Sequence, residues 1–183
     1  MAVNTPVCNF GIRAPDFELS DTEGKLWSLE SLRGPRGLLV MFLCNHCPYV
    51  KAILERLCTD VKEVQAMGIG TAAILSNDAT AYPEDSFENM QRLAREKALP
   101  FPYLHDPTQE VARAFDAVCT PDFFGYNGNL ELQYRGRLDA SALTAPPPDR
   151  RRELVLAMRL IADTDKGPVE QMPSMGCSIK WRA

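Results

Sequence analysis

Two cysteines separated by two residues, in the segment Cys44-Asn45-His46-Cys47, are the side chains best suited to chemistry in this chain. They follow the apolar run 38–43 and precede a stretch whose apolar residues recur every three to four positions, which predicts a strand followed by a helix. A thiol must ionise before it attacks a disulfide, and the free N–H groups and dipole of a helix N-terminus favour the thiolate. The position of the pair therefore predicts cysteines that alternate between a dithiol and a disulfide.

The roles of the two cysteines follow from their expected exposure. In such a pair the first cysteine is usually the exposed one, so we expect Cys44 to attack and Cys47, one turn inside the helix, to resolve the mixed disulfide. His46 is expected to tune the thiolate, with simple solvent exposure as the alternative. Paired cysteines are also common zinc ligands, but a structural zinc site normally takes a second pair, which the sequence lacks. We expect no metal and no cofactor, and inert structural cysteines are the other alternative.

A second candidate segment is Cys119-Thr120-Pro121, which follows a predicted helix and precedes an aromatic strand. Pro121 could be a trans proline at a sheet edge, or a cis proline that brings the backbone of the strand up to the sulfurs. The sequence leaves both possibilities open.

Further candidates come from the loops and the C-terminal tail. Asn77 follows the apolar run 69–75, and the carboxyl ends of parallel strands share one edge, so it is a candidate substrate contact or, alternatively, part of a helix-capping loop. Cys177 lies in a tail that could fold back over the sheet, as a third redox cysteine or as a packed thiol. The other cysteines are expected to be packing residues or bystanders, namely Cys8, Cys58 and Cys119.

The order of the predicted elements indicates the fold class. Strands and helices alternate, which is typical of an α/β sandwich with a partly parallel sheet, and a closing hairpin adds antiparallel strands. The expected elements are a hairpin (14–20 and 25–27), a helical turn (28–32), strands 38–43, 69–75 and 101–104, a helix through 50–64, helices 83–98 and 107–118, a hairpin (123–124 and 130–134), and a helix (150–162). An N-terminal extension (1–35) and an irregular tail (163–183) complete a single domain of residues 1–183.

Composition excludes several classes of protein. The chain has 183 residues with 20 Lys and Arg against 24 Asp and Glu, a formal net charge of −4. Nucleic acid is therefore not an expected partner, because phosphate binding needs a concentrated positive surface. No run approaches the roughly 20 apolar residues that span a bilayer, and the first residues do not resemble a signal peptide. We expect a cytoplasmic protein without a membrane partner, and the sequence leaves its oligomeric state open.

Several segments together resemble the thioredoxin-like superfamily, in the redoxin branch related to alkyl hydroperoxide reductase and thiol-specific antioxidant proteins. The segments are Ala14-Pro15-Asp16-Phe17-Glu18-Leu19, Cys44-Asn45-His46-Cys47-Pro48-Tyr49-Val50 and Thr120-Pro121-Asp122-Phe123-Phe124. Two further segments resemble a bacterial subfamily that carries this CNHCPYV motif. They are Tyr134-Arg135-Gly136-Arg137-Leu138-Asp139 and Pro173-Ser174-Met175-Gly176-Cys177-Ser178-Ile179-Lys180-Trp181.

This resemblance implies a thioredoxin-like sandwich, with a mixed central sheet, helices on both faces and an N-terminal β-hairpin extension. It implies a thiol–disulfide oxidoreductase with Pro121 as a cis proline opposite Cys44 and Cys47. We further expect Asn45, Thr120 and Cys177, with Asn77, to face the substrate. The expected partners are a disulfide-containing protein or small thiol, and a reducing partner.

Two departures from relatives of this kind shape the alternatives. The strand 38–43 carries no ionisable residue where thioredoxin has a buried carboxylate, so proton transfer must use another group or water. Peroxiredoxins carry a threonine three residues before the reactive cysteine. In this chain that position holds Cys44 if Cys47 is the reactive cysteine, and Met41 if Cys44 is. A thiol peroxidase is therefore the weaker alternative, followed by a non-catalytic binding or metal protein.

Overall fold

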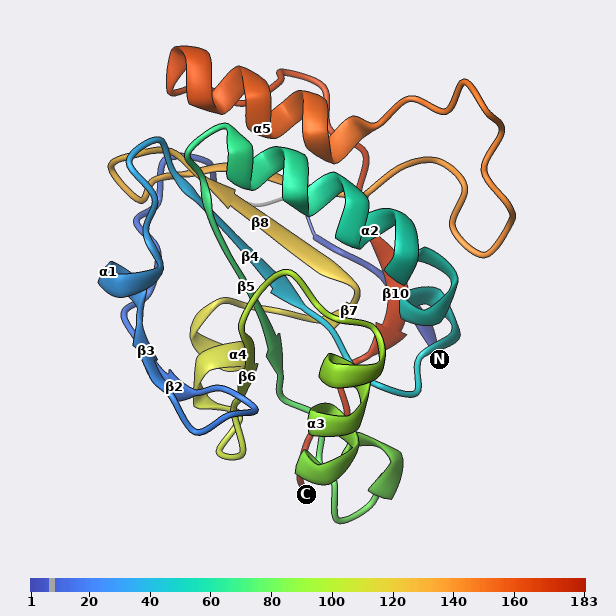
Figure 1. Ribbon diagram of the computed structural model, residues 1–183. Coiled ribbons are helices and arrows are strands. Elements are labelled where there is room, and N and C mark those ends of the chain that lie inside the picture. Colours follow the sequence, from blue (N-terminus) through green and yellow to red (C-terminus); the bar gives the residue numbers. More distant parts are fainter. Residues whose placement is uncertain (7–8) are drawn as a thin grey trace.

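A five-stranded mixed sheet forms the centre of the computed structural model, which describes residues 1–6 and 9–183 (Figure 1). The strands β4, β5 and β6 are parallel, and β8 and β9 run antiparallel to their neighbours. In spatial order they are β6 (Tyr103–His105), β5 (Gly70–Leu75), β4 (Leu38–Phe42), β8 (Asp122–Tyr126) and β9 (Leu132–Gly136). The mixed sheet with helices on both faces confirms the predicted fold class.

The central strand β4 explains why its sequence is apolar throughout. Leu39 and Met41 point into the core on one face of the sheet, and Val40 and Phe42 point into the core on the other. A strand covered on both faces needs apolar residues at every position, because successive side chains alternate between the faces.

Helices and loops cover the two faces of the sheet. One core lies under α2 (Pro48–Ala66), α3 (Phe87–Glu96) and α5 (Glu153–Thr164), and α2 and α5 run side by side in Figure 1. The other core lies under α1 (Leu29–Leu32), α4 (Glu110–Ala114) and the N-terminal region that carries the hairpin β2 (Glu18–Ser20) and β3 (Leu26–Ser28). No helix among the described residues is long and apolar enough to cross a membrane.

The C-terminal tail differs from its prediction as an irregular segment. It contains β10 (Met175–Ser178), which pairs with β1 (Ala2–Asn4) on one side and with β7 (Cys119–Thr120) on the other. Gly176 allows this pairing, because a Cβ there would clash with the Thr120 carbonyl. The sequence hides the strand because it is short and its side chains face mixed surroundings.

Two helices are also shorter than predicted. The predicted helix 83–98 divides into the 3₁₀ turn η1 (Pro83–Asp85) and α3, because Ser86 caps α3 through a bond from the Asn89 N–H to its hydroxyl. The predicted helix 107–118 is only the five-residue α4. Cys8 lies outside the described residues.

Candidate redox site

The two cysteines lie where β4 passes into α2, as predicted, but their exposure differs from the expectation. Cys44 is 1% exposed and Cys47 is 0% exposed, so exposure does not distinguish an attacking sulfur from a resolving one. Cys47 is the N-cap residue of α2 rather than a residue one turn inside it, with Pro48 at the first helical position. The positive end of the helix dipole therefore acts most directly on Cys47.

Thr120 contacts both sulfurs. Its hydroxyl lies 3.1 Å from the Cys44 sulfur, and its carbonyl oxygen lies 3.2 Å from the Cys47 sulfur, where it accepts a hydrogen bond from the neutral thiol. The Thr120–Pro121 peptide bond is cis. Of the two possibilities that the sequence left open, the structure has the cis proline. Thr120 itself is buried, so its hydroxyl faces Cys44 rather than open solvent.

Hydrogen bonds place the negative charge of the pair on Cys47. The Cys44 thiol donates to the Cys47 sulfur and lowers the pKa of Cys47, while burial opposes the shift. The Cys177 thiol and the backbone N–H groups of Val50 and Cys177 lower this pKa further. These donors outweigh burial and the single Thr120 carbonyl, so Cys47 ionises first.

Cys44 has the opposite shift. Its hydrogen bond to Cys47 raises the pKa of Cys44, burial raises it further, and the nearby Asp85 carboxylate adds to the effect against a lowering by the Thr120 hydroxyl. Cys44 therefore remains a neutral donor while Cys47 carries the charge. This direction of shift differs from the one expected for an attacking Cys44, since α2 begins at Pro48, after both cysteines.

Asp85, at the end of η1, organises the segment between the cysteines. Its fully buried side chain accepts from the Asn45 N–H at 2.8 Å, from the Asn77 amide at 2.7 Å and from His46 Nδ1 at 2.7 Å. Asp85 was not among the predicted site residues. It lies 40 residues after Asn45 in the sequence, and the local pattern of residues carries no signal for a contact over that separation.

The neighbours of Asp85 have structural contacts of their own. Asn77 also accepts from the Lys180 N–H at 2.8 Å, so it ties Asp85 to the C-terminal tail, and its contact with a substrate stays a prediction. The Asn45 amide accepts from the Tyr103 hydroxyl at 3.0 Å and donates to the Glu84 carbonyl, so β6 and η1 hold it in place.

His46 keeps a partly open face, with its side chain 24% exposed. Its ring stacks on Tyr82 with 5.8 Å between centroids, while its Nδ1 faces Asp85. The ring therefore joins the surface to the buried carboxylate. This is the arrangement that a group moving protons near Cys44 requires.

Cys177 is brought beside the pair by β10. Its partner in the antiparallel pairing with β7 is Thr120, and its thiol and backbone N–H both contact the Cys47 sulfur. Unlike the other two cysteines it is only half-buried. We call the cluster of Cys44, Cys47, Asp85, Thr120 and Cys177 the redox corner.

One set of donors in the described part of the chain could hold a metal ion. The Cys44 sulfur, a His46 ring nitrogen and an Asp85 oxygen lie within 4.8 Å of one another. A thiolate, an imidazole and a carboxylate are ligands that zinc accepts, yet here the Asp85 oxygens already accept three hydrogen bonds.

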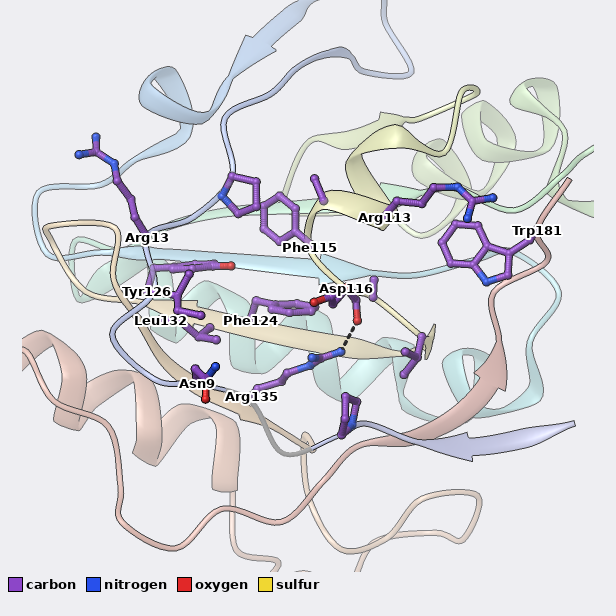
Figure 2. A pocket seen from close by; sticks show the side chains of 16 residues that line it. Asn9, Arg13, Arg113, Phe115, Asp116, Phe124, Tyr126, Leu132, Arg135 and Trp181 are labelled. Carbon is purple, nitrogen blue, oxygen red and sulfur yellow. Dashed lines mark hydrogen bonds between the residues drawn. The ribbon is translucent and has the colours of Figure 1, made fainter.

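Two cavities flank this part of the fold. One of about 310 Å³ opens beside Pro121 and is lined mainly by apolar side chains, among them Tyr49, Ile53, Phe123 and Met175. The other, of about 620 Å³, lies on the opposite face of the sheet and is lined by Arg13, Arg113, Phe124, Arg135 and Trp181; we call it the arginine cavity (Figure 2).

A paired-cysteine segment between a central strand and a helix, next to a cis proline at the start of the neighbouring strand, defines a thioredoxin-like protein. The family model described as the AhpC/TSA family matches residues 10–141, so the chain belongs to that family. This confirms the predicted redoxin branch, while the CNHCPYV subfamily stays a prediction. Among curated proteins, the comparison found no match.

Solved structures share the fold of this chain. The crystal structure of an uncharacterized conserved protein from Geobacillus kaustophilus has 41% sequence identity and a TM-score of 0.94, covering 100% of this chain and 97% of that one. A hypothetical protein from Sinorhizobium meliloti 1021 has 36% identity and a TM-score of 0.90, covering 98% of each chain. The thioredoxin domain of a thiol-disulfide oxidoreductase from Bacteroides vulgatus has 16% identity and a TM-score of 0.61 over 75% of this chain and 94% of that one, which shows the fold alone.

Proposed function

We propose that this protein is a thiol–disulfide oxidoreductase that cycles the Cys44–Cys47 pair between dithiol and disulfide. The observation that carries the proposal is the contact of both sulfurs, at the N-terminus of α2, with Thr120. Donation from the Cys44 thiol toward the Cys47 sulfur leaves one charge on the pair. A thiolate held next to a neutral thiol is the state from which disulfide exchange begins.

In the proposed reaction Cys47 attacks and Cys44 resolves, the reverse of the order expected from the sequence. The Cys47 thiolate attacks a sulfur of the substrate disulfide, and the first substrate thiolate leaves. Cys44 then loses its proton and attacks Cys47, so that the Cys44–Cys47 disulfide forms and the second substrate thiolate leaves. Two electrons pass from the pair to the substrate, and a reducing partner restores the dithiol.

Asp85 and His46 supply the proton acceptor that the apolar strand 38–43 lacks. Asp85 is close enough to Cys44 to raise its pKa, and it contacts His46 Nδ1 at 2.7 Å. We propose that the Cys44 proton leaves through this pair when Cys44 attacks. The carboxylate thus comes from η1 rather than from the strand that leads to the cysteines.

The substrate class follows from the cavity beside Pro121. Its apolar lining suits the side chains that flank a disulfide in a polypeptide, which supports a protein disulfide over a small polar one. We expect reduction of insulin to be faster than reduction of glutathione disulfide at equal disulfide concentration.

Cysteine variants test the mechanism. Cys47→Ser should lose nearly all insulin reduction. Cys44→Ser, combined with Cys177→Ala to remove the neighbouring thiol, should accumulate a mixed disulfide at Cys47, detected as a mass adduct. Cys58→Ala, a cysteine on α2 outside the site, is the matched control and should keep the wild-type rate. Unchanged turnover in Cys47→Ser would refute the proposal, and an adduct that accumulates only in Cys47→Ser would restore the opposite order.

A second candidate function, thiol peroxidase, is favoured by one contact. The threonine that the motif lacks is supplied from β7, where the Thr120 hydroxyl lies 3.1 Å from the Cys44 sulfur. A hydroxyl in this position could donate to a peroxide oxygen that a thiolate attacks. Rapid consumption of hydrogen peroxide, with sulfenic acid trapped at Cys47 or Cys44, would favour this function.

A further inference from the structure

Cys177 offers an external thiol a more exposed sulfur than either member of the pair does. Cys44 is 1% exposed and Cys47 is 0% exposed, so a Cys44–Cys47 disulfide would be covered in the same way. A reductant needs a sulfur that it can approach along the S–S axis. Cys177 is the half-buried thiol next to the pair.

The strand pairing fixes Cys177 against Cys47. β10 runs antiparallel to β7 with Cys177 opposite Thr120, the residue that contacts both sulfurs. β10 also lies beside the start of α2, where Figure 1 shows it below the first turn of the helix. The Cys177 thiol and its own N–H both donate toward the Cys47 sulfur.

We propose that Cys177 is a third redox cysteine, which takes over Cys47 from the Cys44–Cys47 disulfide and so gives external thiols access to the buried pair. This inference rests on the proposed thiol–disulfide function and adds the route of electron entry. It uses the partly exposed position of Cys177 and its direct contact with Cys47.

The exchange balances without an external oxidant. In the oxidised protein the Cys177 thiol gives its proton to solvent, and the resulting thiolate attacks the Cys47 sulfur. The Cys47–Cys177 bond forms, the Cys44–Cys47 bond breaks, and Cys44 leaves as a thiolate and takes up a proton. The number of disulfides is unchanged.

Reduction then follows at the exposed sulfur. The thiolate of an external dithiol attacks Cys177, and Cys47 leaves as a thiolate. The second thiol of the reductant then attacks the reductant sulfur that is bonded to Cys177. Cys177 leaves as a thiolate, and the reductant departs as a disulfide. Two electrons have passed from the dithiol to the protein, and the reverse sequence accepts a disulfide.

The electrostatics favour the second step through its leaving group, Cys47, and the first step through its nucleophile, Cys177, whereas the raised pKa of Cys44 makes it the poorer leaving group. Hydrogen bonds hold the pKa of Cys47 low, and a thiol of low pKa is the better leaving group. Burial and the contact with Cys47 raise the pKa of Cys177 to about 11, against a lowering by Lys180. When Cys47 is in a disulfide it carries no charge, so its share of this effect disappears and Cys177 becomes a better nucleophile.

Mapping the disulfide tests the contact. Mild oxidation of Cys44→Ser with diamide should give an internal Cys47–Cys177 disulfide, seen as a tryptic cross-link between peptides 37–51 and 167–180. The double variant Cys44→Ser/Cys177→Ala should give no such cross-link. If Cys44→Ser forms only adducts or dimers through Cys47, the inference is wrong.

Kinetics separate this inference from the proposed function. The oxidised Cys177→Ala protein should be reduced by dithiothreitol about tenfold more slowly than wild type. Cys58→Ala, which removes another half-buried thiol, should match wild type. Wild-type kinetics in Cys177→Ala, with insulin reduction intact, would overturn the inference and leave the proposed function standing. If wild-type protein forms no Cys44–Cys47 disulfide, both proposals are wrong.

Discussion

The redox corner and the arginine cavity lie on opposite faces of the same sheet, and their polar groups are satisfied in different ways. In the arginine cavity, Arg135 pairs with buried Asp122 at 2.9 Å and donates to the Asp116 carbonyl at 2.7 Å, the bond drawn in Figure 2. Its guanidinium also stacks over Phe124 at 4.5 Å. The charge of Arg135 is thus matched by a fixed partner.

In the redox corner the charge belongs to a group that reacts. The Cys47 thiolate is stabilised by thiols and N–H groups, and each of the two thiols can itself lose a proton or form a bond. The difference shows that the volume of a cavity does not mark a functional site. The larger cavity is lined by groups that hold the fold together, and the chemistry that we propose lies where thiols with shifted pKa values face one another.

The largest expected effect is on stability, in the arginine cavity. Arg135→Met leaves the Asp122 carboxylate buried without its partner, which should lower the free energy of unfolding by about 3–5 kcal/mol. Urea unfolding measures this loss. The folded fraction should keep wild-type insulin reduction, and a selective loss of activity would show that the two regions are coupled.

A pH-dependent effect distinguishes the redox corner. Because the pKa of Cys47 is lowered on folding, the unfolded chain binds more protons below the ordinary thiol pKa, so the stability from Cys47 rises with pH. We expect the difference between the free energies of unfolding of wild type and Cys47→Ala to increase as the pH is raised toward about 8.5. The slope of this increase should be at most about 1.4 kcal/mol per pH unit.

Above that pH the trend should reverse, since the raised pKa of Cys44 makes the folded state bind the extra proton. Urea titrations of the reduced protein at several pH values measure both limbs. Oxidised protein is the control, because a disulfide has no thiol proton. A flat difference in the reduced protein would contradict the charge placed on Cys47.

A smaller effect is expected from the buried carboxylate of the redox corner. Asp85→Asn removes the charge that helps raise the pKa of Cys44, so the second thiolate should form at lower pH than in wild type. Absorbance of the thiolate at increasing pH measures the shift. Glu84→Gln removes an exposed charge from the same turn and should leave the titration unchanged.

The smallest effect is expected at the rim of the arginine cavity. Arg113→Ala removes a guanidinium that lies 4.4 Å from the Trp181 ring centroid, which should cost about 0.5–1 kcal/mol of stability. Thermal unfolding measures this change. Insulin reduction should be unaffected, and a fall in rate would mean that this cavity takes part in substrate binding.

Much of the fold could be predicted because its signals are local. The apolar run of β4 and the helical period of α2 are each set by burial of consecutive residues, and both were found with the cysteine pair between them. The strand β10 was not predicted and the length of α4 was overestimated, since a four- or five-residue element carries too little periodicity to define its presence or its ends.

The sequence by itself determined the chemistry available to this protein: two cysteines at a strand–helix junction, and a Thr-Pro dipeptide before a later strand. Spacing and helix position are local properties, so they can be read from the chain. Only the tertiary structure decided which sulfur carries the charge, because the N-cap position of Cys47, the Asp85 carboxylate and the Cys177 thiol meet through long-range packing. Electrostatic shifts depend on burial and on distances of a few ångström, and neither is encoded in the order of nearby residues.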